Sequence, residues 1–250
     1  MKVYFIGAGP GDPELITVKG QRILSEANII IYAGSLVNPV LLDVRKHECE
    51  LYDSAYLSFD EVTAIYEKER GSDKIIARLH SGEPSLFGAI KEQIDWLREN
   101  GIDYEIVPGV SSFSASAAAL SAELTLPGVS QTVVITRMAG RTPVPEGQEI
   151  STLAKHKPTM CVFLSVHMID ELVEELRKGY TDDTPIAVVE RASWPDERII
   201  RGTISNIAEK VKAAGITKTA MIIVGSVLDG GYAKSKLYDP SFSHGYRKSR

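Results

Sequence analysis

Short apolar runs alternate with amphipathic segments along most of the chain. In the first half, most of these runs are short and rich in strand-forming residues. This alternation is typical of βαβ units and predicts a parallel sheet of five strands. The predicted strands are Val3–Ile6, Ile29–Tyr32, a weaker one near Glu50–Leu51, Ile75–Leu79 and Tyr104–Val107.

The segments between these strands carry helix start and stop signals. One helix is expected to begin near Thr17, and a Ser-x-x-Glu capping box opens another over Ser58–Arg70. A third helix is predicted from about Phe87 to Asn100, where Gly101 ends it.

The second half repeats the alternation with a different topology. The turn Trp194–Asp196 lets a strand return antiparallel, so this sheet is predicted to be mixed. A Gly/Pro-rich loop, Arg137–Gly147, is long enough to suggest a function. The predicted strands are Thr132–Thr136, Thr159–Leu164, Ile186–Val189, Arg198–Arg201 and Ala220–Val224.

A stretch of small residues, Ser111–Ala122, separates the two halves. We therefore predict two α/β lobes, residues 1–115 and residues 116–250. A clean helical stripe between the last two strands supports an α/β second lobe.

Composition narrows the class of protein. With 33 acidic and 28 basic residues, the net charge of −5 argues against a nucleic-acid binder. Cys49 and Cys161 lie far apart in apolar stretches, as expected for buried thiols in a reducing compartment. Neither a signal peptide nor an apolar run of about 20 residues is present, so we expect a cytosolic protein without a membrane partner.

Three glycine-bearing loops directly follow strands of the first sheet: Gly7–Pro13, His80–Gly88 and Pro108–Ser112. Loops at the carboxyl ends of strands are where open α/β sheets bind ligands. A dinucleotide site is disfavoured, because the third glycine of the first loop comes one residue early and prolines interrupt the turn. For each loop taken alone, a plain strand-to-helix connection is the alternative.

Together these loops resemble the tetrapyrrole methylase family. The matching segments span nearly the whole chain: VYFIGAGPGDPELIT (Val3–Thr17), RLHSGEPSLFG (Arg78–Gly88), VPGVSSFSA (Val107–Ala115) and AMIIVG (Ala220–Gly225). Members of this family are two-lobed enzymes that methylate porphyrinoid intermediates with S-adenosylmethionine. The resemblance implies two α/β lobes, a parallel five-stranded sheet and a mixed sheet, with the active site in the cleft between them.

Three further segments narrow the resemblance. YAGSLV (Tyr32–Val37), the loop Thr136–Gly147 and the ending Leu237–Arg247 are similar to the subgroup that methylates carbon 11 of precorrin-4 or cobalt-precorrin-4 in cobalamin biosynthesis. One departure separates the chain from the uroporphyrinogen methylases. Ala89 stands where those enzymes usually carry an arginine, although Glu92 matches their acid.

The resemblance also implies site residues. The sulfonium already activates the methyl group, so neither a metal nor a covalent enzyme intermediate is expected. His80 and Glu92 are the candidate proton-transfer residues, and Arg78, Arg137 and Arg141 are candidates to grip the substrate carboxylates. Arg78 could instead be paired structurally. Cofactor contacts fall on Pro10, Ser81, Gly82, Glu83, Leu86, Ser111, Ser112, Leu164, Ala192, Ala220 and Met221.

Several expectations stay open at this stage. A homodimer is expected from the resemblance alone. Another precorrin, uroporphyrinogen III, RNA or protein could be the substrate, and a non-catalytic tetrapyrrole carrier is a further alternative. The sequence does not say whether cobalt is already in the ring. The apolar residues Leu237, Tyr238, Phe242 and Tyr246 suggest that the C-terminal segment packs against the body, with disorder as the alternative.

Overall fold

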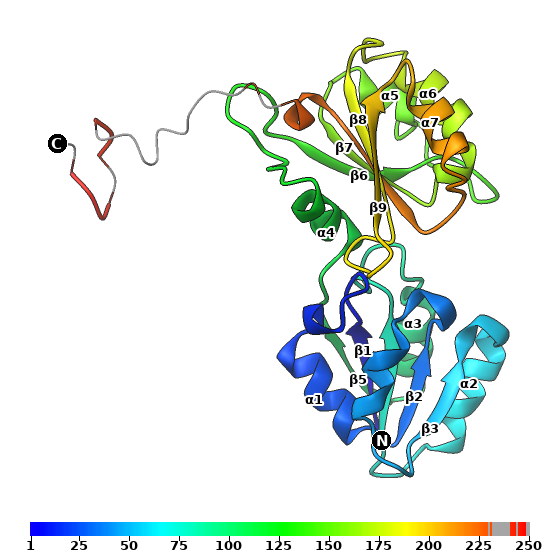
Figure 1. The fold of residues 1–250 in the computed structure, drawn as a ribbon. Coiled ribbons are helices and arrows are strands. Elements are labelled where there is room, and N and C mark those ends of the chain that lie inside the picture. Colours follow the sequence, from blue (N-terminus) through cyan, green and yellow to red (C-terminus); the bar gives the residue numbers. More distant parts are fainter. Residues whose placement is uncertain (230, 232–240, 244, 249–250) are drawn as a thin grey trace. The chain divides into compact units, whose positions relative to one another are not determined.

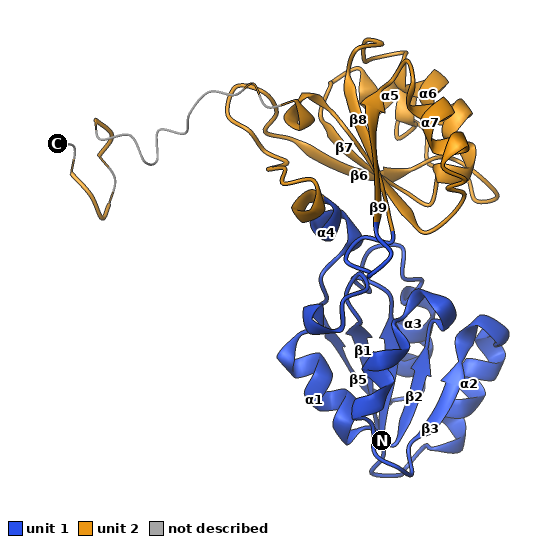
Figure 2. Cartoon of the chain, in the orientation of Figure 1, with its two compact units in different colours: residues 1–116, 191–197 blue, residues 117–190, 198–250 orange. Residues whose placement is uncertain are grey.

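The computed structural model describes residues 1–229, 231, 241–243 and 245–248. Its chain forms two compact units, shown in different colours in Figure 2. Unit 1 comprises Met1–Ser116 and Arg191–Glu197, and unit 2 comprises Ala117–Glu190 and Arg198–Arg250. The first unit is thus discontinuous in sequence, and a segment of seven residues joins it from the second half of the chain.

Unit 1 is built on a sheet of five parallel strands in the order β3-β2-β4-β1-β5 (Figure 1). The predicted parallel sheet is confirmed, and its second strand matches the prediction residue for residue. The strands are β1 (Lys2–Gly7), β2 (Ile29–Tyr32), β3 (Glu50–Asp53), β4 (Ile75–His80) and β5 (Asp103–Val107).

Two helices of unit 1 begin at caps that the sequence predicts. The Thr17 hydroxyl accepts the N–H of Gly20, and both bonds of the capping box between Ser58 and Glu61 are present. The α-helices are α1 (Val18–Glu26), α2 (Phe59–Lys68), α3 (Lys91–Glu99) and α4 (Ser112–Ala119), of which α4 runs across the unit boundary. Short 3₁₀ helices are η1 (Pro13–Leu15), η2 (Gly34–Leu36), η3 (Pro39–Val44) and η4 (Ser54–Tyr56).

The predicted start of the third helix was wrong. It begins at Lys91, not at Phe87, because Phe87 and Ala89 have positive φ angles of 56° and 49°. That backbone conformation cannot propagate a right-handed helix. The predicted end is confirmed, since Gly101 follows the helix with φ of +64°.

Unit 1 has a hydrophobic core on each face of its sheet. Ile6 belongs to the cluster that includes Leu24 of α1, whereas its neighbour Phe5 belongs to the cluster that includes Tyr66 of α2 and Leu97 of α3. All five are fully buried. Successive residues of a strand point to opposite faces of the sheet. Because helices cover both faces, the side chains on both faces are buried, and such a strand is apolar at nearly every position.

Unit 2 contains a mixed five-stranded sheet in the order β6-β7-β10-β8-β9, as predicted. Only β6 and β7 are parallel, and the other neighbours are antiparallel. The strands are β6 (Val133–Arg137), β7 (Thr159–Phe163), β8 (Pro185–Glu190), β9 (Arg198–Thr203) and β10 (Ala220–Val224). The helices are α5 (Ile150–Ala154), α6 (Ile169–Leu176), α7 (Ile207–Ala213), η5 (Val166–Met168) and η6 (Ser226–Leu228).

The core of unit 2 joins its three α-helices to one face of the sheet. Alternate residues of the central strands, such as Val162, Val188 and Ile222, pack with Leu172 of α6 and Val211 of α7. All five side chains are fully buried. Figure 1 shows α5, α6 and α7 gathered beside the same sheet.

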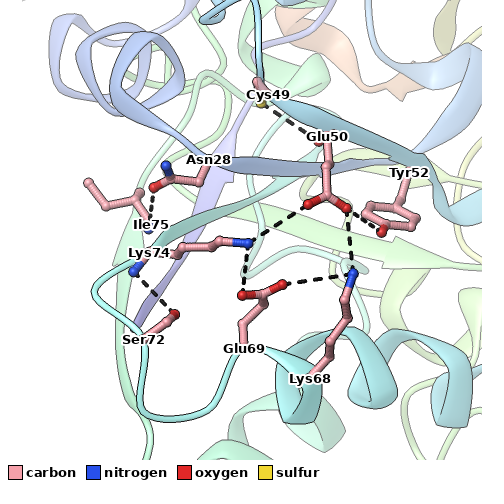
Figure 3. A network of polar contacts seen from close by, with 9 residues as sticks. All are labelled: Asn28, Cys49, Glu50, Tyr52, Lys68, Glu69, Ser72, Lys74 and Ile75. Carbon is pink, nitrogen blue, oxygen red and sulfur yellow. Dashed lines mark hydrogen bonds and ion pairs between the residues drawn. The ribbon is translucent and has the colours of Figure 1, made fainter.

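A polar network lies where β2, β3 and β4 begin (Figure 3). The largely buried Glu69 carboxylate pairs with Lys74 at 2.9 Å, and Lys68 approaches both Glu69 and Glu50 at about 4 Å. Tyr52 donates to Glu50 at 2.8 Å, and hydrogen bonding to this phenol lowers the pKa of Glu50. The charges of this network pair with one another at the amino ends of the strands. We therefore interpret the network as structural.

Both cysteines are free, and burial raises the pKa of the Cys161 thiol to about 12. In the part of the chain that the structure describes, no helix has the length and apolar character needed to cross a bilayer. Of the predicted C-terminal packing residues, Leu237 and Tyr238 lie outside the described residues. Tyr246 is fully exposed, so the expected packing is wrong for that residue.

Candidate functional site

The three glycine-bearing loops meet at the carboxyl edge of the unit 1 sheet. They follow β4, β1 and β5, which are neighbours in that order. An isolated bridge joins the first loop to the second: Gly82 donates its N–H to the Gly9 carbonyl at 2.8 Å, and Gly9 donates to the Gly82 carbonyl at 3.3 Å. The first two loops are therefore held together by backbone hydrogen bonds.

Close backbone packing explains two of the glycines. A Cβ atom on Gly109 would lie 2.2 Å from the Gly82 carbonyl oxygen and 2.7 Å from the Gly7 Cα. A Cβ atom on Gly7 would lie 2.5 Å from the Gly109 Cα. No real Cβ tolerates such distances, so these two glycines allow three backbones to meet at one point.

Gly82 has a different requirement. Its φ is +63°, a conformation that glycine adopts without cost, and an added Cβ would meet nothing closer than the Ser112 nitrogen at 3.7 Å. The other near atoms belong to Val110 and Ser111. The second loop thus faces the third loop across Gly82. In the third loop Ser111 is buried, and the half-buried Ser112 is the first residue of α4.

Glu83 ties the same two loops together. One carboxylate oxygen accepts the Gly109 N–H at 2.7 Å, and the other accepts the Ser85 N–H at 2.9 Å. Partial burial alone would raise the pKa of Glu83, but these backbone hydrogen bonds outweigh it, so the pKa is lowered. The carboxylate is ionised at neutral pH, and both of its oxygens already accept hydrogen bonds from backbone N–H groups.

The second loop ends in strained backbone. Phe87 and Ala89 have left-handed φ angles without being glycine, and the Phe87 ring is 45% exposed. Such strain persists only where the surroundings hold it, and it clusters at functional sites. Ser81 and Leu86 of the same loop are half-buried. Sequence reasoning did not single out Phe87, and a left-handed phenylalanine leaves no signal in composition.

His80 and Arg78 are buried below this edge. Desolvation, with a smaller contribution from the nearby Arg78 charge, lowers the pKa of His80 to about 3, so the ring is neutral at pH 7. Its Nε2 atom has no hydrogen-bond partner among the described residues. The Arg78 guanidinium donates to the Ile31 carbonyl at 3.3 Å and to Gln93 at 3.4 Å. For Arg78 this geometry favours the structural alternative.

Glu92, unlike His80 and Arg78, is not buried. It is exposed in the first turn of α3, where a carboxylate is favoured by the helix dipole. His80 is therefore buried and neutral at pH 7, and Glu92 is exposed, so neither has the surroundings expected of a proton-transfer residue.

A further segment at this edge contains the predicted cofactor residue Ala192, but the sequence analysis missed the contacts of its neighbours. The segment Arg191–Glu197, hereafter the β8–β9 segment, belongs to unit 1 by its contacts. Its Trp194 donates to the Pro10 carbonyl at 2.9 Å, and its Ser193 accepts the Asp12 N–H at 3.0 Å. The buried Ala192 precedes these residues, so the predicted cofactor residues Pro10 and Ala192 belong to neighbouring, hydrogen-bonded segments.

The predicted cofactor and substrate residues in unit 2 lie at one edge of its sheet. Arg137 pairs with Phe163, the residue before Leu164, and Ala220 pairs with Glu190 at the end of β8. Leu164 has a left-handed φ of 54° and is 64% exposed, an unfavourable state for an apolar residue. Ala220 is half-buried and Met221 is buried.

The two predicted substrate arginines of this edge differ in their surroundings. The Arg137 guanidinium donates to the carbonyls of Met138, Thr142 and Pro143 at 2.9 to 3.1 Å and so shapes the loop that follows β6. Arg141, in the same loop, is exposed. Arg137 therefore fixes loop conformation, whereas Arg141 is accessible to an anion.

Comparison with known families identifies the arrangement. The model of the Tetrapyrrole (Corrin/Porphyrin) Methylases matches residues 2–208. The chain belongs to the tetrapyrrole methylase family. The match includes the three loops, the β8–β9 segment and four of the five strands of the unit 2 sheet, so both units of this tetrapyrrole methylase contribute to it.

Individual relatives agree with the family match. The chain is 58% identical to the cobalt-precorrin-4 C(11)-methyltransferase of Methanocaldococcus jannaschii over 250 residues, which cover 99% of this chain and 96% of that protein. The X-ray structure of a cobalamin biosynthetic enzyme, cobalt precorrin-4 methyltransferase, superposes with a TM-score of 0.89 at 44% identity. It covers 91% of this chain and 96% of its own.

A second solved structure is of a protein with a bound product. Uroporphyrin-III C-methyl transferase from Thermus thermophilus, complexed with S-adenyl homocysteine, has a TM-score of 0.78 and 29% identity to this chain. The similarity covers 92% of this chain and 99% of that one.

Proposed function

We propose that this chain is an S-adenosylmethionine-dependent C-methyltransferase of cobalamin biosynthesis that methylates carbon 11 of cobalt-precorrin-4 or precorrin-4. The observation that carries the proposal is the 58% identity to a cobalt-precorrin-4 C(11)-methyltransferase over nearly the full length of both chains. The three interlocked loops at the carboxyl edge of the unit 1 sheet supply a ligand site of the expected kind.

The residues present fit S-adenosylmethionine. The methionyl end of this molecule carries a carboxylate and an ammonium, which call for hydroxyls and peptide groups. Ser81, Ser111 and Ser112 bring such groups to the loops that face each other across Gly82. The adenine end calls for apolar walls, and the exposed, strained Leu164 has the character of such a wall. Contacts from Leu86, Ala192, Ala220 and Met221 remain predictions.

When bound, S-adenosylmethionine supplies a methyl group already activated by a sulfonium. The protein's part in the transfer is then alignment, because holding two reacting atoms at about 3–3.5 Å replaces a bimolecular encounter. Glu83 is a positioning residue in this scheme, since its carboxylate is filled by Gly109 and Ser85 and only fixes the loops. The neutral, buried His80 fits a positioning role better than proton transfer.

The substrate ring carries several carboxylates. Of the three predicted arginines, Arg141 is the best placed to bind one, because the guanidinium groups of Arg78 and Arg137 already donate to protein acceptors. No metal is proposed for the protein itself. Within the described residues, no three His, Cys, Asp or Glu side chains are grouped as metal ligands would be.

Turnover with purified tetrapyrroles tests the proposal. We expect methyl transfer from labelled S-adenosylmethionine to cobalt-precorrin-4 or precorrin-4, with NMR of the product placing the new methyl on carbon 11. Uroporphyrinogen III is the matched control substrate. Preferred turnover of uroporphyrinogen III would assign the chain to an earlier step, and a tightly bound pigment without methyl transfer would indicate a carrier.

Two further predictions accompany this function. A homodimer, expected from the family resemblance, is tested by analytical ultracentrifugation at micromolar concentration, where a monomer mass contradicts it. A cytosolic location is tested by cell fractionation, where recovery in the membrane pellet contradicts it.

A further inference from the structure

The β8–β9 segment connects two strands of the unit 2 sheet, yet its contacts assign it to unit 1 (Figure 2). Hairpin loops are usually about two to five residues long, so this connection of seven residues is longer than a hairpin requires. Here it carries a tryptophan and a serine that bond to backbone groups more than 180 positions earlier in the chain. These side chains therefore do more than close the hairpin, because they bind the segment to the first loop.

The contacts of this segment fall on consecutive residues of the first loop. The Trp194 indole N–H donates to the Pro10 carbonyl at 2.9 Å, and Ser193 Oγ accepts the Asp12 N–H at 3.0 Å. Between them, a Cβ atom on Gly11 would lie 2.1 Å from the Trp194 ring. Gly11 is therefore required by the indole that covers it, and the two bonds on either side fix the orientation of the loop.

The segment is braced internally. The Arg191 guanidinium lies 4.1 Å from the Trp194 ring centre and pairs with Asp196 at 2.7 Å. Glu197 accepts the Ser193 N–H at 2.7 Å. Arg191 and Ser193 both have left-handed φ angles, 50° and 67°, without being glycine. Such a conformation is unfavourable for a residue other than glycine and persists where the surrounding contacts over-determine it.

We propose that Trp194, supported by Ser193, is a positioning residue for cofactor binding: it clamps the Pro10–Asp12 loop so that Pro10 and Ala192 are presented to S-adenosylmethionine as one rigid surface. This inference rests on the proposed function. Trp194 acts by fixing the backbone of the first loop. The Gly9–Gly82 bridge joins the first loop to the second, so the position of the second loop is fixed as well.

Binding of S-adenosylhomocysteine, measured by isothermal titration calorimetry, tests the clamp in four variants. Trp194→Ala removes ring and hydrogen bond, Trp194→Phe removes mainly the hydrogen bond, and Gly11→Ala forces a methyl group into the ring. The fourth variant combines Trp194→Ala with Gly11→Ala. Trp96→Phe, at the other tryptophan of the chain, is the matched control because it lies in α3 and packs near Tyr66.

We expect Trp194→Ala and Gly11→Ala each to weaken binding at least tenfold and Trp194→Phe to be intermediate. The double variant should be no weaker than Trp194→Ala alone, because the added methyl group then meets no ring; this non-additivity separates a clamp from two independent defects. In turnover assays the KM for S-adenosylmethionine should rise while kcat at saturation changes by less than about threefold.

The outcomes separate the two proposals. If the wild type fails to bind S-adenosylhomocysteine, the proposed function fails, and the clamp fails with it. If the wild type binds and Trp194→Ala binds within twofold, or the single effects add in the double variant, only the clamp is overturned. Should Trp194→Ala unfold in a thermal melt, Trp194→Phe and Ser193→Ala carry the test, and wild-type affinity in both overturns it.

Discussion

The carboxylate of Glu83 accepts the backbone N–H of Gly109 at 2.7 Å and so joins the loop after β4 to the loop after β5. Its other oxygen accepts the N–H of Ser85. A carboxylate that receives two amide donors cannot be replaced by an amide without turning one N–H toward another donor.

Glu83→Gln should therefore lower the free energy of unfolding by about 1–3 kcal/mol and weaken S-adenosylhomocysteine binding. The folded-state pKa of Glu83 is lowered, so its stabilisation is complete above the ordinary value of 4.5 and is lost as the pH falls through the lower folded value. Urea unfolding from pH 7 to pH 3 should show the difference from wild type shrinking below pH 4.5. Glu48→Gln, at an exposed position, is the control.

The buried His80 predicts a second loss of stability as the pH falls, over a different range. Its pKa is about 3 in the folded chain against 6.5 in the unfolded chain, so below pH 6.5 the unfolded chain binds the extra proton. Stability should fall by at most about 1.4 kcal/mol per pH unit between pH 6.5 and 3 from this residue. The slope of unfolding free energy against pH should be shallower in His80→Gln and unchanged in the exposed His156→Gln. Equal slopes in all three proteins would contradict the neutral ring.

Gly109→Ala should be strongly destabilising, because its Cβ would lie 2.2 Å from the Gly82 carbonyl oxygen. We expect a loss of more than about 2 kcal/mol, since backbone at that point cannot move without separating three loops. Gly140→Ala, whose Cβ would meet nothing within 4 Å, is the control. Thermal melts of equal midpoint for the two variants would show that the three backbones do not meet as described.

Gly82→Val should separate binding from folding. The Cβ atom of the new side chain would meet no atom closer than 3.7 Å, but a β-branched residue at φ of +63° is strained by on the order of 1–3 kcal/mol. We expect a folded protein that no longer binds S-adenosylhomocysteine. Affinity within twofold of wild type in calorimetric titration would show that the loop is only a connection.

Leu164→Gly should raise stability and lower affinity together. Relief of the left-handed conformation favours glycine, and the 64% exposed side chain contributes little packing. We expect up to about 1 kcal/mol of added stability, with several-fold weaker S-adenosylhomocysteine binding. Lys157→Gly relieves the same conformation at an exposed position and should leave affinity unchanged. Equal affinities for both variants would remove Leu164 from the cofactor contacts.

The pattern of apolar residues in the sequence was sufficient to predict the strands of both sheets. Ile29–Tyr32 and Ala220–Val224 match their strands residue for residue, because β-branched runs bounded by turn residues have few other uses. The start of α3 was misplaced because Phe87 and Ala89 are ordinary helix residues by composition. In the structure both have a left-handed backbone, in a loop so tight that a Cβ on Gly88 would lie 2.2 Å from the Pro84 carbonyl oxygen.

For the candidate site, sequence indicated the loops but not how they are held. Gly82 was predicted to contact the cofactor, which stays a prediction, and the close backbone contacts of Gly7 and Gly109 were not predicted. Trp194 was read only as part of a turn, since no local pattern reveals a partner at Pro10. Contacts between distant residues depend on chain topology, which short-range periodicity does not contain.

The discontinuity of unit 1 has a consequence for biosynthesis of the protein. Residues up to Ser116 emerge first and can form their sheet, but the first loop lacks Ser193 and Trp194 until roughly 80 further residues are made, about 4–16 s at ordinary elongation rates. A nascent chain stalled before Arg191 should therefore contain a folded sheet whose Pro10–Asp12 loop is still uncovered. The Pro10–Asp12 loop, although translated among the first residues, therefore reaches its final contacts only after residues from the second half of the chain have been made.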